Sequence, residues 1–173
     1  MQTLVVMVGL PGSGKDYYIN SLNDGDSPND IILSTDNILE DIADDLGSTY
    51  NEVFKTHYKE AERIMETMIQ NSLNHHGFVI WNQTNLTKKK RKKILNRFRK
   101  FDRKVCVYIK IDEEVHKQRL AYREQTQGKF ISDEVIEKMR STLEEPSMGE
   151  GFDEIFYIDN SDFEFKVIQK YDR

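Results

Sequence analysis

Eight consecutive residues near the start of the chain have the types and spacing needed to hold phosphate groups. The apolar run 4–8 leads directly into the segment Gly9-Leu10-Pro11-Gly12-Ser13-Gly14-Lys15-Asp16. A glycine-rich turn between a strand and a helix exposes backbone N–H groups to an anion, and the helix dipole adds to the attraction. The lysine of such a loop can reach the β and γ phosphates. We therefore expect residues 9–16 to bind a nucleotide through its phosphates.

The last position of this segment differs from the usual phosphate loop. A Ser or Thr normally stands there and places its hydroxyl on Mg²⁺, whereas this chain has Asp16. A carboxylate is a good ligand for hard cations, so Asp16 is a candidate metal ligand, directly or through water. The alternative is that Asp16 only caps the following helix, where the dipole favours an acid.

Chemistry also needs an acceptor site opposite the phosphate loop, and in α/β sheets such sites lie at the carboxyl ends of strands. Asp36 follows the apolar run 31–33. It could accept the proton of an attacking hydroxyl, or it could be the N-cap of the next helix. A second segment, Asn82-Gln83-Thr84-Asn85, follows the apolar run 78–81.

Two arginines supply candidate phosphate clamps. Arg119 and Arg123 lie four residues apart, and therefore on one face of a predicted helix. Guanidinium groups there could bind the β and γ phosphates and neutralise the charge that develops during phosphoryl transfer. The simpler alternative is a solvated or ion-paired arginine pair.

Charge is distributed unevenly along the chain. Residues 84–104 hold eleven basic residues and the single acid Asp102, a local charge of +10 that leaves −15 on the rest of a chain whose total is −5. Apolar residues at Ile94, Leu95, Phe98 and Phe101 have the spacing of a helix with one buried side. The run is therefore either a solvated helix face or a surface that attracts nucleic-acid phosphates. Lys89, near its start and beside the segment 82–85, is a candidate acceptor contact.

Length and composition favour one intracellular domain. With 173 residues, of which 38% are hydrophobic, we expect a single globular domain over residues 1–173. No signal peptide or membrane span is apparent, so we expect a cytoplasmic protein without a membrane partner. A viral protein that acts inside a host cell would also fit this expectation. Cys106 lies in an apolar run and is expected to be a buried thiol. The histidines have no ligand spacing with Cys or acidic partners, and no metal role is assigned to them.

Apolar runs alternate with helical patterns, which is typical of a parallel α/β architecture. In the long helix, apolar positions at Phe54, Tyr58, Ala61, Met65 and Met68 are expected to pack in the core. We expect a loop at 23–30, strands at 4–8, 31–33, 78–81, 105–111 and 154–158, and helices at 15–22, 37–46, 50–73, 113–127 and 133–144, besides the basic helix.

The ordered set of motifs resembles the polynucleotide 5′-kinase branch of the P-loop kinases. The set comprises Gly-x-Pro-Gly-Ser-Gly-Lys, an aspartate after the second strand, x-Thr-Asn-Leu followed by basic residues, and two arginines four apart. The similarity continues to Glu145-Pro146 and to Gly151-Phe152-Asp153-Glu154-Ile155, and so covers nearly the whole chain. The resemblance implies a P-loop kinase fold, with a parallel sheet of four to five strands, flanking helices and a helical lid, and it implies ATP and Mg²⁺ as cofactors.

The resemblance also implies roles for individual residues. Asp36 would be the general base beside Lys15, Arg123 would be the lid arginine with Arg119 in support, and Thr84-Asn85 would form part of the acceptor wall. Two positions depart from the family pattern on the acceptor side. Gln83 stands where the family usually has Asp, and Asn37-Ile38-Leu39-Glu40 stands where it tends to have an arginine.

These observations predict an ATP- and Mg²⁺-dependent kinase that transfers the γ-phosphoryl group to a hydroxyl of a nucleic acid, with a polynucleotide 5′-hydroxyl as the first candidate. The alternatives within enzymes are a kinase for hydroxymethyl groups on modified DNA bases and a nucleoside or nucleotide kinase. A non-catalytic nucleotide-binding switch is the alternative from another class, and Asp16 is its best support. No obligate protein partner is expected.

Overall fold

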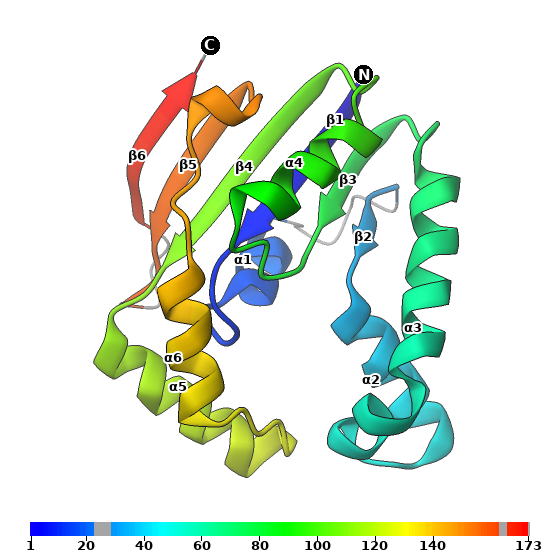
Figure 1. Cartoon of the computed structure of the whole chain (residues 1–173), viewed down its shortest axis with the longest axis vertical. Helices are drawn as coiled ribbons and strands as arrows, with labels where there is room; N and C mark the ends of the chain where they lie inside the picture. Colours follow the sequence, from blue (N-terminus) through cyan, green and yellow to red (C-terminus); the bar gives the residue numbers. More distant parts are fainter. Residues whose placement is uncertain (23–28, 163–165, 173) are drawn as a thin grey trace.

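The chain folds around one twisted sheet with the strand order β2-β3-β1-β4-β5-β6 (Figure 1). The computed structural model describes residues 1–22, 29–162 and 166–172. The strands are β1 (Gln2–Val8), β2 (Ile31–Leu33), β3 (Gly77–Trp81), β4 (Arg103–Lys110), β5 (Glu154–Asp159) and β6 (Lys166–Asp172). Strands β1 to β5 are parallel, and β6 runs antiparallel to β5.

Helices cover both faces of the sheet and its carboxyl edge (Figure 1). They are α1 (Lys15–Leu22), α2 (Thr35–Leu46), α3 (Tyr50–Ser72), α4 (Lys88–Arg97), α5 (Glu113–Gln127), α6 (Asp133–Thr142) and the short 3₁₀ turn η1 (Met148–Glu150). In Figure 1 the parallel strands point toward the start of α2 and toward α5 and α6. The loops that follow the strands are therefore gathered where these helices meet.

Alternate residues of the central strand pack into two separate cores. Leu4, Val6 and Val8 of β1 face a large cluster to which α2, α3 and α4 contribute their apolar sides. Met7 belongs to a smaller cluster on the other face, where Ile19 of α1 is buried. The sheet is thus covered on both faces, as a parallel sheet requires.

Side-chain caps fix where α2 and α3 begin. Ser34 Oγ accepts the backbone N–H of Asn37, so α2 begins at Thr35, two residues earlier than predicted. Thr49 and Glu52 form a capping box at the start of α3. The alternative role of Asp36 as the N-cap is therefore wrong, because Ser34 fills it and Asp36 lies in the first turn of the helix.

Most predicted elements are present, and the parallel α/β prediction is confirmed. Helices 15–22 and 113–127 have the predicted bounds, and Cys106 is buried as expected. The strand β6 was not predicted, so the sheet has a sixth strand beyond the expected four to five. Of the predicted loop at 23–30, residues 23–28 lie outside the described part of the chain.

The prediction for the buried face of α3 is wrong in its first half. Val53 is buried there, whereas Phe54 and Tyr58 are 44% and 40% exposed. From Ala61 and Met65 onward the predicted and observed buried positions agree, because this part of the helix packs in the main core. Two aromatic rings thus project from α3 without core packing.

Part of the basic segment is structural. Arg91 is fully buried, donates from Nε and Nη2 to the Glu150 carboxylate at 2.7 and 2.8 Å, and also binds the carbonyl groups of Asn85 and Leu86. Removing one partner of such a buried pair costs roughly 3–5 kcal/mol. Ion pairs also hold Arg97 and Arg103, and Lys104 binds the Phe101 carbonyl. Seven basic residues on and just after α4 are exposed without an ion pair among the described residues, namely Lys88, Lys89, Lys90, Lys92, Lys93, Arg99 and Lys100.

Candidate active site

The phosphate loop connects β1 to α1 and is shaped by glycine. Gly12 and Gly14 have φ angles of 76° and 98°, values that L side chains rarely adopt. A Cβ atom at Gly14 would also overlap the Asn160 side chain. The chain therefore needs glycine here, and the result is the strand, loop and helix arrangement that binds phosphate.

Lys15 is held against the loop that it follows. Its Nζ donates hydrogen bonds to the carbonyl groups of Gly9 and Leu10 at 3.1 and 2.9 Å. Burial lowers the pKa of Lys15 to about 8, against the opposing effect of the Asp16 and Asp36 carboxylates. A bound triphosphate would raise the pKa of Lys15 again, because the phosphate charges stabilise the charged form.

Two buried side chains that the sequence analysis did not identify support the loop. Asn160, directly after β5, donates from Nδ2 to the Ser13 carbonyl at 2.8 Å. His116 on α5 is fully buried, with Nε2 2.7 Å from the Pro11 carbonyl and Nδ1 3.2 Å from Nη2 of Arg140 on α6. A carbonyl only accepts and a guanidinium only donates, so His116 is the neutral tautomer with its proton on Nε2.

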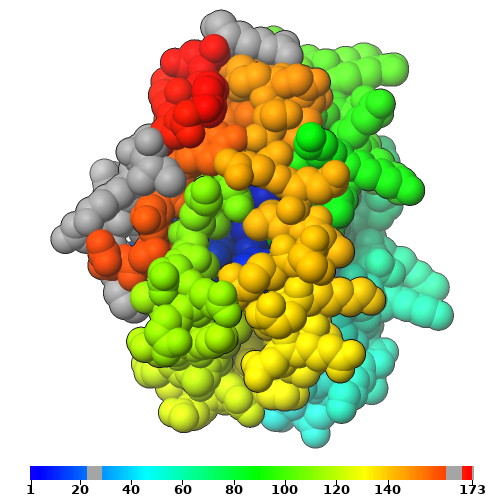
Figure 2. Space-filling view, turned by 60° about the vertical axis from the view of Figure 1, so that its left-hand side comes forward, coloured from blue at the N-terminus to red at the C-terminus, as the bar shows by residue number. Residues whose placement is uncertain are grey.

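The two predicted arginines lie at the phosphate loop. A Cβ atom at Gly12 would lie 3.4 Å from Arg123 Nη1, and one at Gly14 would lie 3.8 Å from Arg119 Nη1. Arg119 Nη2 also donates to the Asn160 carbonyl at 2.6 Å, which fixes its guanidinium beside the loop. Figure 2 shows the N-terminal segment (blue) at the bottom of a hollow between α5 and α6.

Asp36 lies in the first turn of α2 and is exposed. The Tyr50 hydroxyl donates to Asp36 Oδ1 at 2.7 Å. The pKa of Tyr50 is raised, first by burial and then by the Asp36 carboxylate, so this phenol stays a hydrogen-bond donor at neutral pH. A hollow of about 750 Å³ lies beside Tyr50, lined by α2, the start of α3 and residues 127–129.

The segment after β3 divides into different roles. Gln83 Nε2 donates to Thr35 Oγ1 at 2.7 Å, and the Thr84 carbonyl accepts the Gly9 N–H. Asn85 is fully buried with a φ of 49°, and its Nδ2 binds the Met7 carbonyl at 2.7 Å. The expected acceptor role of Asn85 is corrected, because its side chain is fully buried and binds the end of β1. Lys89 is exposed on α4.

Asp16 is the candidate ligand for a cation at the loop. Asn82 Nδ2 donates to Asp16 Oδ1 at 2.5 Å, while Asp16 itself is exposed. Among the described residues, no group of three Asp, Glu, His or Cys side chains could hold a metal alone. One carboxylate fits Mg²⁺, which binds proteins through one or two carboxylates together with substrate phosphates.

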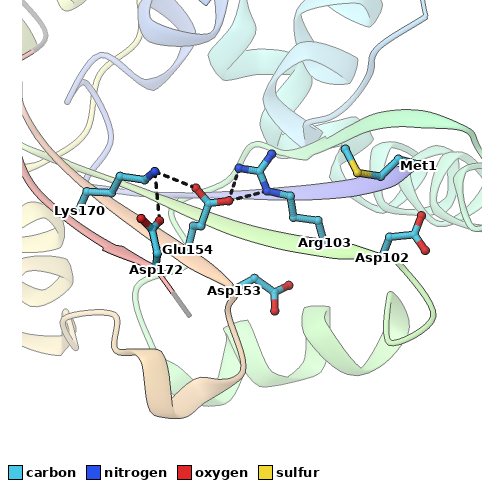
Figure 3. Close-up of a pocket in the computed structure, with 7 residues that line it drawn as sticks. All are labelled: Met1, Asp102, Arg103, Asp153, Glu154, Lys170 and Asp172. Atoms are coloured by element: carbon cyan, nitrogen blue, oxygen red, sulfur yellow. Dashed lines mark hydrogen bonds and ion pairs between the residues drawn. The ribbon is translucent and has the colours of Figure 1, made fainter.

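A second hollow lies at the opposite edge of the sheet and has a different character (Figure 3). It measures about 610 Å³ and is lined by Met1, Asp102, Arg103, Asp153, Glu154, Lys170 and Asp172. Its charged groups bind one another, with Glu154 pairing with both Arg103 and Lys170. Asp102 and Asp153 accept backbone N–H groups. These groups are used inside the fold, so we place the site at the phosphate loop.

The buried neutral His116 predicts a pH-dependent stability. Burial lowers the pKa of His116 in the folded state, with Arg140, Lys15 and Arg119 adding to the effect and the Pro11 carbonyl opposing it. Its contribution to stability is therefore complete above pH about 6.5 and decreases as the pH falls below that value. Urea unfolding measured between pH 8 and pH 5.5 gives the free energy of unfolding. As the pH falls, this free energy should decrease less for His116→Gln than for wild type. The control is His76→Gln at an exposed site, and an equal loss in all three proteins would contradict the prediction.

Comparison with known proteins agrees with this geometry. The structure is similar to a proposed kinase from Chloroflexus aurantiacus J-10-fl, with a TM-score of 0.66 and 18% identity over 93% of this chain and 86% of that one. It is similar to Chaetomium thermophilum Kti12 in complex with ADP-AlF₃, with a TM-score of 0.60 and 16% identity over 90% and 88%. A chain of the Pnkp1/Rnl/Hen1 RNA repair complex matches with a TM-score of 0.63 and 20% identity over 82% of this chain and 44% of that chain.

At these identities the structural matches concern the fold. No helix among the described residues has both the length and the apolar character to cross a membrane. The sequence match is more specific, because the model of the AAA_33 family, described as an AAA domain, matches residues 4–146. P-loop kinases of this kind bind ATP together with Mg²⁺. The chain belongs to the AAA_33 family of P-loop kinases.

Proposed function

We propose that this protein transfers the γ-phosphoryl group of ATP to a hydroxyl of a nucleic acid, with the 5′-hydroxyl of a polynucleotide as the first candidate. The observation that carries this proposal is the position of Asp36, an exposed carboxylate in the first turn of α2. The neighbouring Thr35 hydroxyl accepts a hydrogen bond from Gln83, and the next residue, Thr84, binds Gly9 of the phosphate loop. A base close to the phosphates but on the acceptor side is what transfer to a hydroxyl requires.

The donor side supplies positive charge around the phosphates. Lys15, Arg119 and Arg123 reach the loop from α1 and α5. Charge spreads over the oxygen atoms of the transferred group, so cations fixed before the reaction stabilise the transition state.

The acceptor side supplies the proton acceptor. As the acceptor oxygen attacks the γ phosphorus, the bond to the bridging oxygen breaks, ADP leaves, and the hydroxyl proton passes to Asp36. Tyr50 holds Oδ1 of Asp36, which orients the carboxylate for this transfer.

Asp16 and Asn82 together would form the protein part of the Mg²⁺ site. In ordinary P-loop proteins a neutral hydroxyl on the loop and a Walker-B aspartate hold Mg²⁺. Here the loop carries the acid Asp16, and the neutral Asn82 directly follows β3, the neighbour of β1. The site therefore has one carboxylate, as in ordinary P-loop proteins, but this carboxylate lies on the loop and not at the end of the strand. Bound Mg²⁺ would neutralise phosphate charge, with Asp16 as its protein ligand and Asn82 orienting Asp16.

The exposed cations of α4 favour a nucleic acid over a small acceptor. Eight basic residues on and after this helix are exposed, and in the described ranges only Arg97 forms an ion pair with an acid. Helix α4 begins directly after the segment 82–85, so it starts near the phosphate loop. Phosphate groups of a polynucleotide would bind such a row. One of the similar structures is a chain of an RNA repair complex, which agrees with this acceptor class.

Replacing Asp36 should affect the chemical step. Asp36→Asn keeps the size of the side chain but cannot accept a proton, so kcat should fall by roughly 10² or more. The Kd for ATP should hardly change. The control is Asp41→Asn, one turn later on α2 and also exposed. Steady-state transfer to a 5′-hydroxyl oligonucleotide measures kcat, and a fully active Asp36→Asn enzyme would refute the role of Asp36.

Exchanging residues 16 and 82 should test the metal site. Asp16→Ser should raise the Mg²⁺ concentration needed for half-maximal ADP binding roughly tenfold, whereas Asp16→Ser combined with Asn82→Asp should restore it. Calorimetry of ADP binding at varied Mg²⁺ measures this without transfer. A double variant no better than Asp16→Ser would show that Asp16 acts only as a helix cap.

Neutralising α4 should weaken acceptor binding in a salt-dependent way. The variant Lys89→Gln, Lys92→Gln, Lys93→Gln should raise KM for an oligonucleotide and reduce the slope of log KM against log salt by about 0.7 for each lost contact. The Kd for ATP should stay the same. The control is Lys170→Gln on β6. An unchanged slope in the triple variant would favour a nucleoside or another small acceptor.

A further inference from the structure

The exposed aromatic residues of α3 form a continuous row. The rings of Tyr50 and Phe54 have centroids 6.0 Å apart, and those of Phe54 and Tyr58 are 5.1 Å apart. Phe54 and Tyr58 are 44% and 40% exposed. Their spacing of four residues places the rings on one side of the helix, about one turn apart. Core packing therefore does not account for the two outer rings.

The row begins at the candidate general base. Tyr50, its first member, donates its hydroxyl to Asp36. The Asp36 carboxylate also contributes to raising the pKa of Tyr58, after burial and Glu62. The row therefore leads away from the position where the acceptor hydroxyl must react.

Cations and aromatic rings lie on the same side of the sheet. Helices α3 and α4 both pack on the core face that includes Leu4 and Val6, and an ion pair between Arg97 and Glu66 joins them. Sites that bind single-stranded nucleic acids combine a basic surface for phosphates with aromatic rings on which bases stack. The α3 row and the α4 cations have this combination.

We propose that Phe54 and Tyr58 are a stacking platform for the bases that follow the reacting end of a single-stranded acceptor. The position of the reacting end rests on the proposed function, whereas the inference itself concerns binding of the single strand. Stacking uses the face of the base, so the platform accepts any sequence. It favours single strands, because duplex bases already stack on one another.

The test uses the variant Phe54→Leu, Tyr58→Leu, which keeps apolar bulk and removes both rings. Exposed rings contribute little to folding, so the variant should unfold at the wild-type temperature. Ile64→Ala is the matched control, since Ile64 is a 37% exposed apolar residue on the same helix but off the row. The probe is a short fluorescein-labelled single-stranded oligonucleotide, and anisotropy without ATP gives its Kd. An abasic oligonucleotide with the same backbone is the second probe.

The platform predicts a Kd at least about tenfold higher for the double variant with the normal oligonucleotide. With the abasic probe the variant and wild type should bind equally. An unchanged Kd for the normal oligonucleotide, or an equal loss with both probes, would overturn the platform. If binding depends on the rings but no oligonucleotide is phosphorylated, the platform stands and the proposed kinase function fails.

Discussion

Hydrogen bonds to the carbonyl groups of the phosphate loop are the interaction on which the site depends. Lys15 binds the carbonyls of Gly9 and Leu10, His116 binds that of Pro11, and Asn160 binds that of Ser13. A loop whose carbonyls face internal donors is shaped for an anion on its N–H side. The donors come from α1, α5 and the end of β5, so three parts of the fold shape one loop.

The same contacts determine where α5 and α6 lie. His116 connects the loop to Arg140 of α6, and Asn160 accepts a hydrogen bond from Arg119. On the other side of the site, Asn51 Nδ2 binds the Gly128 carbonyl at 2.6 Å. Lys129 pairs with Glu40 and lies 4.8 Å from the centre of the Tyr50 ring. The turn after α5 therefore contacts α2 and α3, and the Tyr50 hydroxyl connects this junction to Asp36.

Local patterns in the sequence were sufficient for much of the fold. The phosphate loop and helix 113–127 follow from glycine positions and periodicity, which are properties of neighbouring residues. The face of α3 did not follow, because Phe54 and Tyr58 have core spacing while the neighbouring Val53 is the buried residue. The edge strand β6 was missed because charged residues such as Lys170 interrupt its apolar pattern.

Candidate site residues could be proposed from the sequence where the residue type itself indicates a chemical role. Asp36 and the arginine pair could be proposed from type and spacing. His116 and Asn160 could not, because their partners in the loop lie 105 and 147 residues away in the chain. The role of Asn85 was also hidden, because its amide binds the carbonyl of Met7, which lies 78 residues away in the chain.

In the proposed reaction, the phosphate loop, Arg119, Arg123 and Asp36 surround one phosphoryl group. A crystal structure with ADP, AlF₃, Mg²⁺ and a short 5′-hydroxyl oligonucleotide would test it most directly. We expect the fluoride group to lie between Lys15 and Arg123 on one side and the terminal hydroxyl on the other, with that hydroxyl within hydrogen-bond distance of Asp36. A fluoride group contacted by the loop while Asp36 binds only Tyr50 and no acceptor would contradict it.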